Sequence, residues 1–343
     1  MKRVIVVGGR GFFGQALFEQ LSEFGIKAVA ASRSQGEIIV DVEDSDSMLQ
    51  VFRRGDIVLD VAGPFQNRTA RLAQAAIELG FDLVDMADCL AYVDSIYGLH
   101  DEARAAGIQI YTACSTVSSV SAAAIIHSGI AAPVAIRGLL VPATRHSAVA
   151  GTALSLFASI GKPIEVLSDG QRSISLGWQK RRRFSLPDPL GSRTGRLFEC
   201  ADPGTLPRRW SQLRSVEFYV DTNVFGLNTL FDLAARIPWL RRLIEINLRR
   251  GLGLSRFLGR SAGAVSYEID GASGESIQVS MTATKNAYRM AILPAALAAQ
   301  SLVDGRCPQE LGVLMPDQHV APERLIEKLE QIGYQITISP SQR

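Results

Sequence analysis

The sequence predicts an α/β protein whose amino-terminal third forms a doubly wound parallel sheet and whose remainder forms a second α/β (α+β) lobe. Short β-branched runs alternate with helical patterns up to about residue 120, which is typical of repeated βαβ units. Beyond that point the segments become longer and less regular, and several prolines fall in expected loops. With 343 residues, of which 47% are apolar, the chain is long enough to bury two cores.

The expected elements of the first lobe alternate in order. Strands are expected at residues 4–7, 28–31, 37–40, 57–61, 83–85 and 108–112, and helices at 15–24, 46–53, 70–79 and 92–106. Gly25, Gly55, Gly80 and Gly107 lie where these helices should end, because glycine readily adopts the left-handed conformation of a helix C-terminus. This order predicts a parallel sheet with helices on both faces.

The second lobe is expected to contain strands at 137–141, 215–220, 264–269 and 278–283. The tail returns to helices at 288–302 and 323–332 and ends in a strand at 335–338. We therefore assign residues 1–121 to a first domain and 122–287 to a second, and expect about 288–343 to complete the first.

Composition and charge exclude several classes of protein. The formal net charge of +2 gives no reason to expect a nucleic acid as partner. No stretch reaches the roughly 20 apolar residues that a membrane span needs. The four cysteines and four histidines are scattered, so neither a disulfide framework nor a metal site is predicted. A soluble, cytoplasmic protein with reduced thiols is expected.

A glycine-rich loop follows the first expected strand. It contains Gly9, Arg10, Gly11, Phe12, Phe13 and Gly14, which fit the pattern G-x-G-x-x-G and lead into a helical pattern. The first glycine of the pattern permits a tight turn, the second lets a pyrophosphate approach the backbone, and the third allows close packing of the helix. The alternative is a turn that only closes a βα unit, but the motif here lies between an expected strand and helix within a continued βαβ pattern. These six residues are therefore expected to bind a dinucleotide in a Rossmann domain.

The end of the second expected strand indicates which dinucleotide is bound. It reads Ser32, Arg33, Ser34, where sheets that bind NAD usually have an acidic residue for the ribose hydroxyls. A guanidinium between two hydroxyls suits a 2′-phosphate instead. We predict NADP(H) as the cofactor; a solvated loop arginine is the alternative.

Two further turns are expected beside the cofactor. Asp41 follows the third strand, where it would either contact the adenine or cap the next helix. Ala62, Gly63 and Pro64 follow the fourth strand and would bring backbone near the ribose and nicotinamide, unless they form a purely structural turn.

The glycine-rich loop and the segments 60–65 (DVAGPF), 80–85 (GFDLVD) and 103–108 (ARAAGI) resemble the saccharopine dehydrogenase and reductase family. The resemblance covers roughly the first 120 residues and continues weakly through 151–152, 169–170 and 312–316. It implies NAD- or NADP-linked chemistry at a C–N bond and a Rossmann lobe that the carboxyl-terminal segment completes. It also implies that the inserted lobe, 122–287, binds substrate or mediates dimers, so a homodimer is expected.

The sequence departs from that family at one important place. Residues 114–119 (CSTVSS) stand where the reductase branch has a Gly-Asp-Pro-Gly type of turn, and no Lys and His pair matches that of the lysine-forming enzymes. The catalytic roles of those enzymes are therefore not transferred to this chain.

Candidates for catalysis come from position. Asp85 and Asp88, at and after the end of the fifth strand, are the candidate acid/base and amine-binding groups, with a structural role, such as helix capping by Asp88, as the alternative. Cys114 and Arg145 are the substrate-contact candidates. A buried packing role for Cys114 and an ordinary surface role for Arg145 are the corresponding alternatives.

Two basic segments allow further interpretations. Residues 180–183 (KRRR) are interleaved with aromatic residues and are either a solvated face or a site for an acidic ligand. Residues 237–258 mix apolar side chains with arginines, which fits peripheral membrane contact or, as we expect, a helical subunit interface.

Together these features predict an NADP(H)-dependent oxidoreductase that acts on a small amino- or imino-bearing substrate. One alternative is a catalytically silent dinucleotide-binding sensor or scaffold. The other is a peripheral membrane reductase that docks through Trp239, Arg241, Arg242, Arg249 and Arg250.

Overall fold

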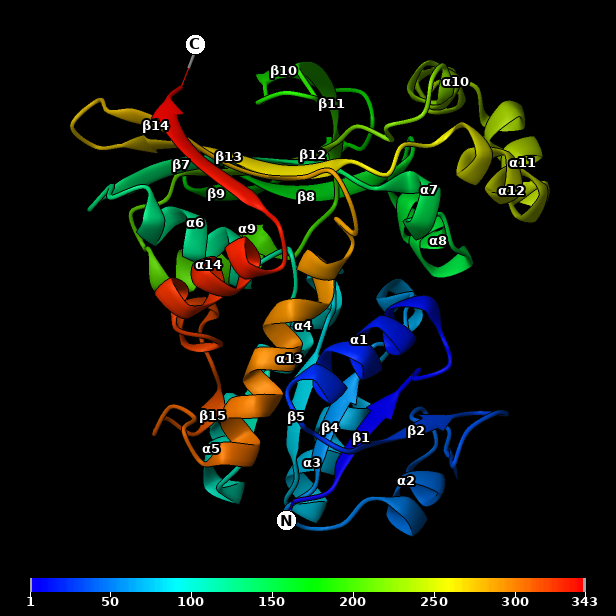
Figure 1. Ribbon diagram of the computed structural model, residues 1–343, viewed down its shortest axis with the longest axis vertical. Coiled ribbons are helices and arrows are strands. Elements are labelled where there is room, and N and C mark those ends of the chain that lie inside the picture. Colours follow the sequence, from blue (N-terminus) through cyan, green and yellow to red (C-terminus); the bar gives the residue numbers. More distant parts are fainter. Residues whose placement is uncertain (1, 342–343) are drawn as a thin grey trace. The chain divides into compact units, whose positions relative to one another are not determined.

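The computed structural model describes residues 2–341, except for the side chain of Arg249, and the chain divides into two compact units (Figure 1). The first unit runs to Val120 and resumes over Arg289–Ala321, while the second comprises Ser121–Tyr288 and the residues from Pro322 onwards. Each unit contains its own sheet.

The first unit consists of parallel strands and the helices that connect them. Its strands are β1 (Val4–Val7), β2 (Ala28–Ser32), β3 (Ile38–Ile39), β4 (Ile57–Asp60), β5 (Asp82–Asp85), β6 (Gln109–Tyr111) and β15 (Gly312–Val313). Its helices are α1 (Phe12–Glu23), α2 (Ser45–Val51), η1 (Phe65–Asn67), α3 (Arg71–Leu79), α4 (Leu90–Tyr97), α5 (His100–Ala106), α13 (Arg289–Asp304) and η2 (Pro316–Gln318).

The first sheet is doubly wound, as the sequence predicts. Its strand order is β15-β6-β5-β4-β1-β2-β3, and every pairing is parallel. Helix α1 packs beside α13, whereas α3 contacts both α2 and α5 (Figure 1). Because the strands are parallel, the loops after β1, β2, β4, β5 and β6 gather at one edge of the sheet, where open α/β sheets bind ligands.

Two elements of the first unit differ from the prediction. The single helix expected at 92–106 is two helices, α4 and α5, because Gly98 ends the first and Leu99 N–H bonds the carbonyl of Ile96 in a tighter turn. The expected third strand is only two residues long. Gly80 and Gly107 end α3 and α5 in the left-handed conformation, as expected.

The second unit combines a mixed sheet with several helices. Its strands are β7 (Pro133–Val141), β8 (Pro163–Ser168), β9 (Gln171–Leu176), β10 (Arg181–Ser185), β11 (Ser192–Phe198), β12 (Ser215–Val220), β13 (Gly263–Gly271), β14 (Ser276–Ala283) and β16 (Gln335–Pro340). Its helices are α6 (Ser119–His127), which starts two residues before the boundary, α7 (Thr144–Ser147), α8 (Ala150–Ser159), α9 (Asp202–Arg209), α10 (Leu227–Ala234), α11 (Pro238–Ile246), α12 (Leu248–Leu258) and α14 (Pro322–Gln331).

The second sheet has the strand order β10-β11-β12-β7-β13-β14-β16, with β8 and β9 branching from β12. The four strands expected in this lobe are present as β7, β12, β13 and β14. A hydrophobic cluster that includes Leu139, Phe184 and Tyr219 lies between β7, β10 and β12. Among residues 2–341, no helix has the length and apolar character needed to cross a bilayer.

The carboxyl-terminal tail is shared between the units, so the expectation that about 288–343 completes the first domain extends too far. Residues 289–321 do join the first unit, where β15 pairs with β6. Strand β16 instead pairs antiparallel with β14, from Ile277 opposite Pro340 to Thr282 opposite Gln335, and thereby belongs to the second sheet.

Candidate functional site

The turn after β1 depends on Gly8, which the sequence pattern does not include. Gly8 has φ +79° and donates its N–H to the carbonyl of Ala31 at 2.9 Å, while its own carbonyl accepts the N–H of Gly11 at 2.9 Å. A Cβ on Gly8 would lie 2.9 Å from the backbone of Ala62. The tight turn expected at Gly9 is therefore made by Gly8, which also brings the ends of β2 and β4 against the loop.

Two glycines of the pattern, Gly9 and Gly14, are required by close packing. A Cβ on Gly9 would lie 2.7 Å from the ring of Phe18, and one on Gly14 would lie 2.3 Å from the carbonyl oxygen of Gly8. Gly11 is exposed and is the N-cap of α1, where no side chain caps the helix. The N-terminus of α1 is thus left open to a ligand that accepts hydrogen bonds.

The other predicted loop residues surround that helix end. Arg10 is exposed, and Phe12 and Phe13 are half-buried with their rings in edge contact, 5.2 Å between centroids. The loop therefore presents a charged side chain and exposed backbone on its open side.

Arg33 lies at the end of β2, two residues after the Ala31 carbonyl that binds the glycine loop. Its side chain is exposed and makes no ion pair within the part of the chain that the structure describes. Ser32, which we expected to contact the 2′-phosphate, bonds within its own turn. Its hydroxyl accepts the N–H of Gln35 at 2.9 Å. Ser34 is exposed.

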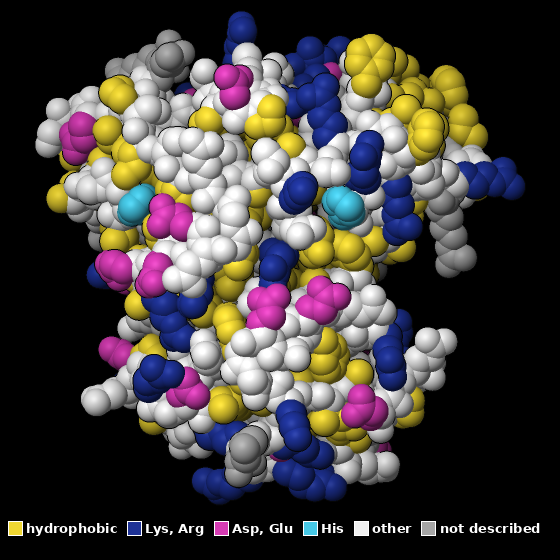
Figure 2. Space-filling model, in the orientation of Figure 1, with side chains coloured by type: hydrophobic (Ala, Val, Ile, Leu, Met, Phe, Trp, Pro, Cys, Tyr) yellow, Lys and Arg dark blue, Asp and Glu magenta, His cyan; other side chains and the backbone are white. Residues whose placement is uncertain are grey.

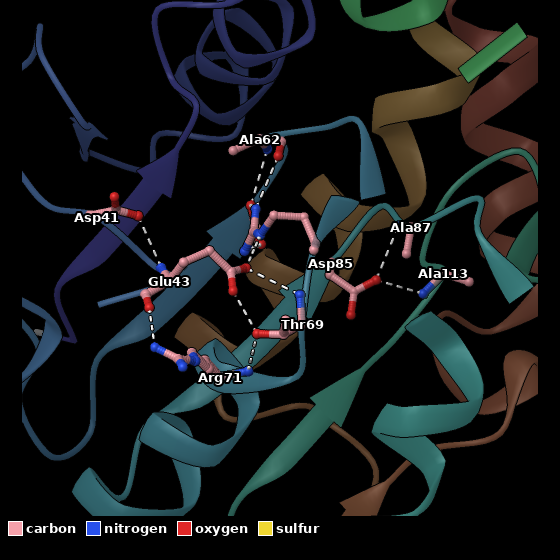
Figure 3. Close-up of polar contacts among 10 residues, drawn as sticks. Asp41, Glu43, Ala62, Thr69, Arg71, Asp85, Ala87 and Ala113 are labelled. Atoms are coloured by element: carbon pink, nitrogen blue, oxygen red, sulfur yellow. Dashed lines mark hydrogen bonds and ion pairs between the residues drawn. The ribbon is translucent and has the colours of Figure 1, made fainter. Parts of the chain in front are cut away.

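Asp41 does not cap the helix that follows it. The N-cap of α2 is Asp44, whose carboxylate accepts the N–H of Asp46 at 3.1 Å. Asp41 instead accepts the N–H of Glu43 at 3.0 Å (Figure 3), and it remains half-exposed at the site edge of the sheet.

The turn at Ala62, Gly63 and Pro64 is held by a buried ion-pair cluster. Asp60, at the end of β4, is fully buried and accepts hydrogen bonds from the Ala62 N–H at 3.0 Å and from Arg68 at 2.8 Å. Arg68 also donates to the Ala62 carbonyl at 2.9 Å. These bonds fix the turn that follows β4.

Glu43 completes this cluster from the loop between β3 and α2 (Figure 3). Its carboxylate accepts hydrogen bonds from Arg68 at 2.7 Å and from the hydroxyl of Thr69 at 2.5 Å, and its carbonyl accepts one from Arg71 at 2.6 Å. The cluster thereby ties the β3 and β4 loops together.

Asp85 lies at the end of β5 and is fully buried. One carboxylate oxygen accepts the N–H groups of Ala87 at 3.0 Å and Ala113 at 2.9 Å, so the side chain joins the ends of β5 and β6 (Figure 3). Burial raises the pKa of Asp85 to about 7, although these two N–H groups oppose the shift. Its other oxygen has no hydrogen-bond partner among the described residues.

The other catalytic and substrate candidates lie in three different settings. Asp88 is half-buried and accepts a hydrogen bond from Gln66 at 3.3 Å; it directly precedes Cys89, which occupies the N-cap position of α4. Cys114 is fully buried, and burial raises the pKa of its thiol. Arg145 is exposed on α7, in the second unit.

A buried histidine from the carboxyl-terminal segment accompanies the turn after β6. His319 is 1% exposed, and its Nδ1 lies 2.8 Å from the hydroxyl of Ser119. Its ring packs on Tyr111, and burial lowers the pKa of His319 to about 4. Among the described residues, no group of three potential metal ligands occurs.

The pKa shifts of Asp85 and His319 predict opposite pH dependences of stability. Between pH 4 and 7 folded Asp85 holds a proton that the unfolded chain lacks, so its contribution to stability falls as the pH rises. Between pH 4 and 6.5 the unfolded chain holds a proton that His319 lacks, so stability rises with pH. Asn in place of Asp85 keeps the acceptor oxygen, so Asp85→Asn should gain stability relative to wild type as the pH rises, on the order of 2 to 4 kcal/mol by pH 8.

Urea denaturation of both proteins at pH 5 and pH 8 measures this difference. A difference in unfolding free energy that is the same at both pH values would show that Asp85 does not titrate as its burial requires.

Three residues that support the site escape sequence analysis. Gly8 lies outside the G-x-G-x-x-G pattern, and Glu43 and Arg68 belong to no motif. Asp60 gives a usable signal, because an acid that ends an apolar strand needs a buried positive partner, and Arg68 is the first basic residue after it.

The similarity of this chain to known proteins is found in its fold rather than in its sequence. No protein-family model matches the sequence, and no curated protein matches it. Among solved structures, saccharopine dehydrogenase (L-Glu forming) from Saccharomyces cerevisiae is similar, with a TM-score of 0.67 over 99% of this chain and 100% of that chain, at 11% identity. The WlbA dehydrogenase from Thermus thermophilus, in complex with NAD and UDP-GlcNAcA, gives a TM-score of 0.41 over 100% of this chain and 97% of that chain, at 12% identity. The chain therefore has the fold of saccharopine dehydrogenase, as its amino-terminal segments implied.

Proposed function

We propose that this chain is an NADP(H)-dependent oxidoreductase that acts on a small amino- or imino-bearing compound. The observation that carries the proposal is the joint arrangement of the open α1 N-terminus, the close-packed glycine turn and the exposed Arg33 at one edge of a parallel sheet. When bound, the nicotinamide would donate or accept a hydride.

The glycine loop fits a pyrophosphate. Gly8, Gly9 and Gly14 fold the loop so tightly that no side chain can occupy it, and Gly11 leaves the backbone exposed at the helix end. Backbone N–H groups and the positive end of the helix dipole favour an anion there.

Arg33 supports NADP(H) over NAD(H). It follows β2 and lies two residues beyond Ala31, whose carbonyl accepts the N–H of Gly8 in the glycine loop. No carboxylate occupies the adjoining positions 31–36. A fixed positive charge with several donors recognises a 2′-phosphate, whereas an acidic residue would repel it.

We therefore expect Arg33→Ala to weaken NADPH binding by about 10- to 100-fold, as for loss of a charged hydrogen bond, while NADH binding changes by less than about threefold. Fluorescence titration of each reduced nucleotide measures both affinities. Arg104→Ala, which alters an exposed arginine on α5, is the matched control and should leave both unchanged.

Equal weakening of NADPH and NADH in Arg33→Ala would remove the assignment of Arg33 to the 2′-phosphate. Tighter binding of NADH than of NADPH by the wild-type protein would replace NADP(H) by NAD(H) as the proposed cofactor.

The two aspartates after β5 divide their roles in this proposal. Asp88 is only half-buried at the site edge and is our candidate for contact with the substrate amine or for proton transfer. Asp85 is enclosed and joins the ends of β5 and β6, so we assign it a positioning role. Cys114 is likewise enclosed, and its proposed role becomes packing beneath the site.

An amino- or imino-bearing substrate is proposed because the chain shares its fold with a saccharopine dehydrogenase that forms L-glutamate. Arg145 and other residues of the second unit remain the groups that we predict to contact the substrate. Steady-state oxidation of NADPH with a panel of oxo acids and amines tests the activity. Nucleotide binding without turnover of any compound would favour a sensor or scaffold instead.

A further inference from the structure

Helices α11 and α12 of the second unit, together with the loop before α10, expose an unusual amount of apolar surface. The residues concerned, which we call the helical patch, are Phe225, Trp239, Leu243, Ile246, Leu254, Phe257 and Leu258. Phe225 is 98% exposed, Phe257 80% and Ile246 74%, and α11 contains no buried residue. Large exposed apolar patches mark contact surfaces, because their exposure to water is costly.

The spacing of these residues gathers them on shared helix faces. Trp239, Leu243 and Ile246 follow one another at four and three residues, which places them on one side of α11. Phe257 and Leu258 follow Leu254 at three and four residues on α12. Figure 2 shows hydrophobic side chains gathered over the region of α10–α12, with Lys and Arg side chains beside them.

The same segment is strongly basic. Between Arg236 and Arg260 the sequence has seven arginines and a single acidic residue, Glu245. The whole chain carries a formal net charge of only +2, so the rest of the chain is net negative. The segment that exposes the apolar side chains is therefore net positive, whereas the rest of the chain is not.

Most of these arginines face solvent. Arg236, Arg242, Arg250 and Arg260 are exposed and form no ion pair within the described residues. The remaining arginines that the structure describes hold the helices in place, because Arg241 donates to the carbonyl of Gly161 at 3.1 Å and Arg256 to that of Ala148 at 2.8 Å. Arg249, named among the expected docking residues, has a side chain outside the described part.

The positive charge of this segment distinguishes between two partners for the helical patch, a second copy of the chain and an anionic membrane. A second copy would meet the patch through a two-fold axis, which brings two equally basic surfaces together. An anionic bilayer instead offers an apolar interior for the aromatic and aliphatic side chains and phosphates for the arginines. The like charges disfavour the subunit interface expected from the sequence at this segment, and the membrane satisfies both features.

We propose that α11 and α12, with the loop before α10, form an in-plane docking surface for a membrane rich in anionic phospholipid. The apolar side chains of the helical patch enter the boundary between headgroups and acyl chains, and the exposed arginines bind phosphate. This goes beyond the proposed oxidoreductase function and does not depend on it.

Vesicle flotation with the full-length protein tests the proposal. Wild type should float with vesicles that contain about a third phosphatidylglycerol and not with pure phosphatidylcholine. Arg242→Glu with Arg250→Glu should weaken binding at least about 25-fold, at about fivefold for each arginine lost. Ile246→Ser with Phe257→Ser should weaken it at least about tenfold, because two exposed side chains no longer enter the bilayer.

Matched controls use exposed residues elsewhere: Ile174→Ser on β9 and Arg104→Glu on α5 should bind vesicles like wild type. Circular dichroism and the unfolding midpoint verify that all variants fold. Absence of wild-type binding to the anionic vesicles, or equal binding to both vesicle types, overturns the proposal. So does a change from dimer to monomer in Ile246→Ser with Phe257→Ser by light scattering, because the patch would then be a self-interface.

Discussion

Replacement of Gly14 by valine is expected to abolish nucleotide binding, with affinity for NADPH reduced by at least about 100-fold. The first atom of any side chain at this position would lie 2.3 Å from the carbonyl oxygen of Gly8 and 2.6 Å from Cα of Gly9. Both neighbours are backbone, so the loop must move to relieve the clash. Such overpacking costs roughly 1–3 kcal/mol of stability, and it distorts the surface that we propose for the pyrophosphate.

A glycine in an uncrowded helix provides the control for this variant. Gly151, near the start of α8, has open space where a Cβ would lie. Gly151→Ala should therefore preserve NADPH affinity and raise stability by up to about 1 kcal/mol, as expected from helix propensity. If Gly14→Val bound NADPH as tightly as Gly151→Ala, the nucleotide would lie elsewhere.

Loss of the Arg68 guanidinium is expected to destabilise the protein by about 3–5 kcal/mol. In Arg68→Met the fully buried carboxylate of Asp60 loses its only described ion-pair partner, and Glu43 loses one of its contacts. Uncompensated charge in the interior is costly because water no longer solvates it. The midpoint and slope of urea unfolding give the change in free energy.

Two further variants isolate the cause. Asp60→Asn together with Arg68→Met removes the unpaired buried carboxylate and leaves an oxygen for the N–H of Ala62. Most of the lost stability should therefore return. Arg306→Ala removes the exposed partner of Asp304 and should cost no more than about 1 kcal/mol. If Arg68→Met were as mild as Arg306→Ala, the cluster would not hold the β4 turn.

The first sheet could be predicted from the sequence because its signals are local. Buried strands such as β1 and β4 are short apolar runs, and Gly80 and Gly107 mark helix ends that the structure confirms. The site edge of the sheet follows from that order, since parallel strands place their carboxyl ends together.

The second unit was predicted less well because its contacts are distant in sequence. Strands β8–β11 and helix α10 were not assigned, whereas residues 237–258 were expected to be helical and form α11 and α12. Alternation along β10 and β11 is broken by charged residues, such as Arg182, which pairs with Glu268 of β13. The last strand joins β14 rather than the first sheet, a choice that depends on which edge is free.

Within the site, residue types were found more readily than their contacts. The pattern G-x-G-x-x-G located the loop, yet the left-handed residue is Gly8, because the turn must close against Ala31 and Ala62. Likewise, both aspartates after β5 fit a catalytic position by sequence, and only burial separates Asp85 from Asp88.

Calorimetric titration of the wild-type protein with NADPH tests the central claim most directly. The account predicts saturable binding of one nucleotide per chain, with a dissociation constant on the order of micromolar and at least about tenfold tighter than that of NADH. Absence of heat from both nucleotides up to about millimolar concentration would contradict it, because the glycine turn and open helix end would then have no nucleotide to hold.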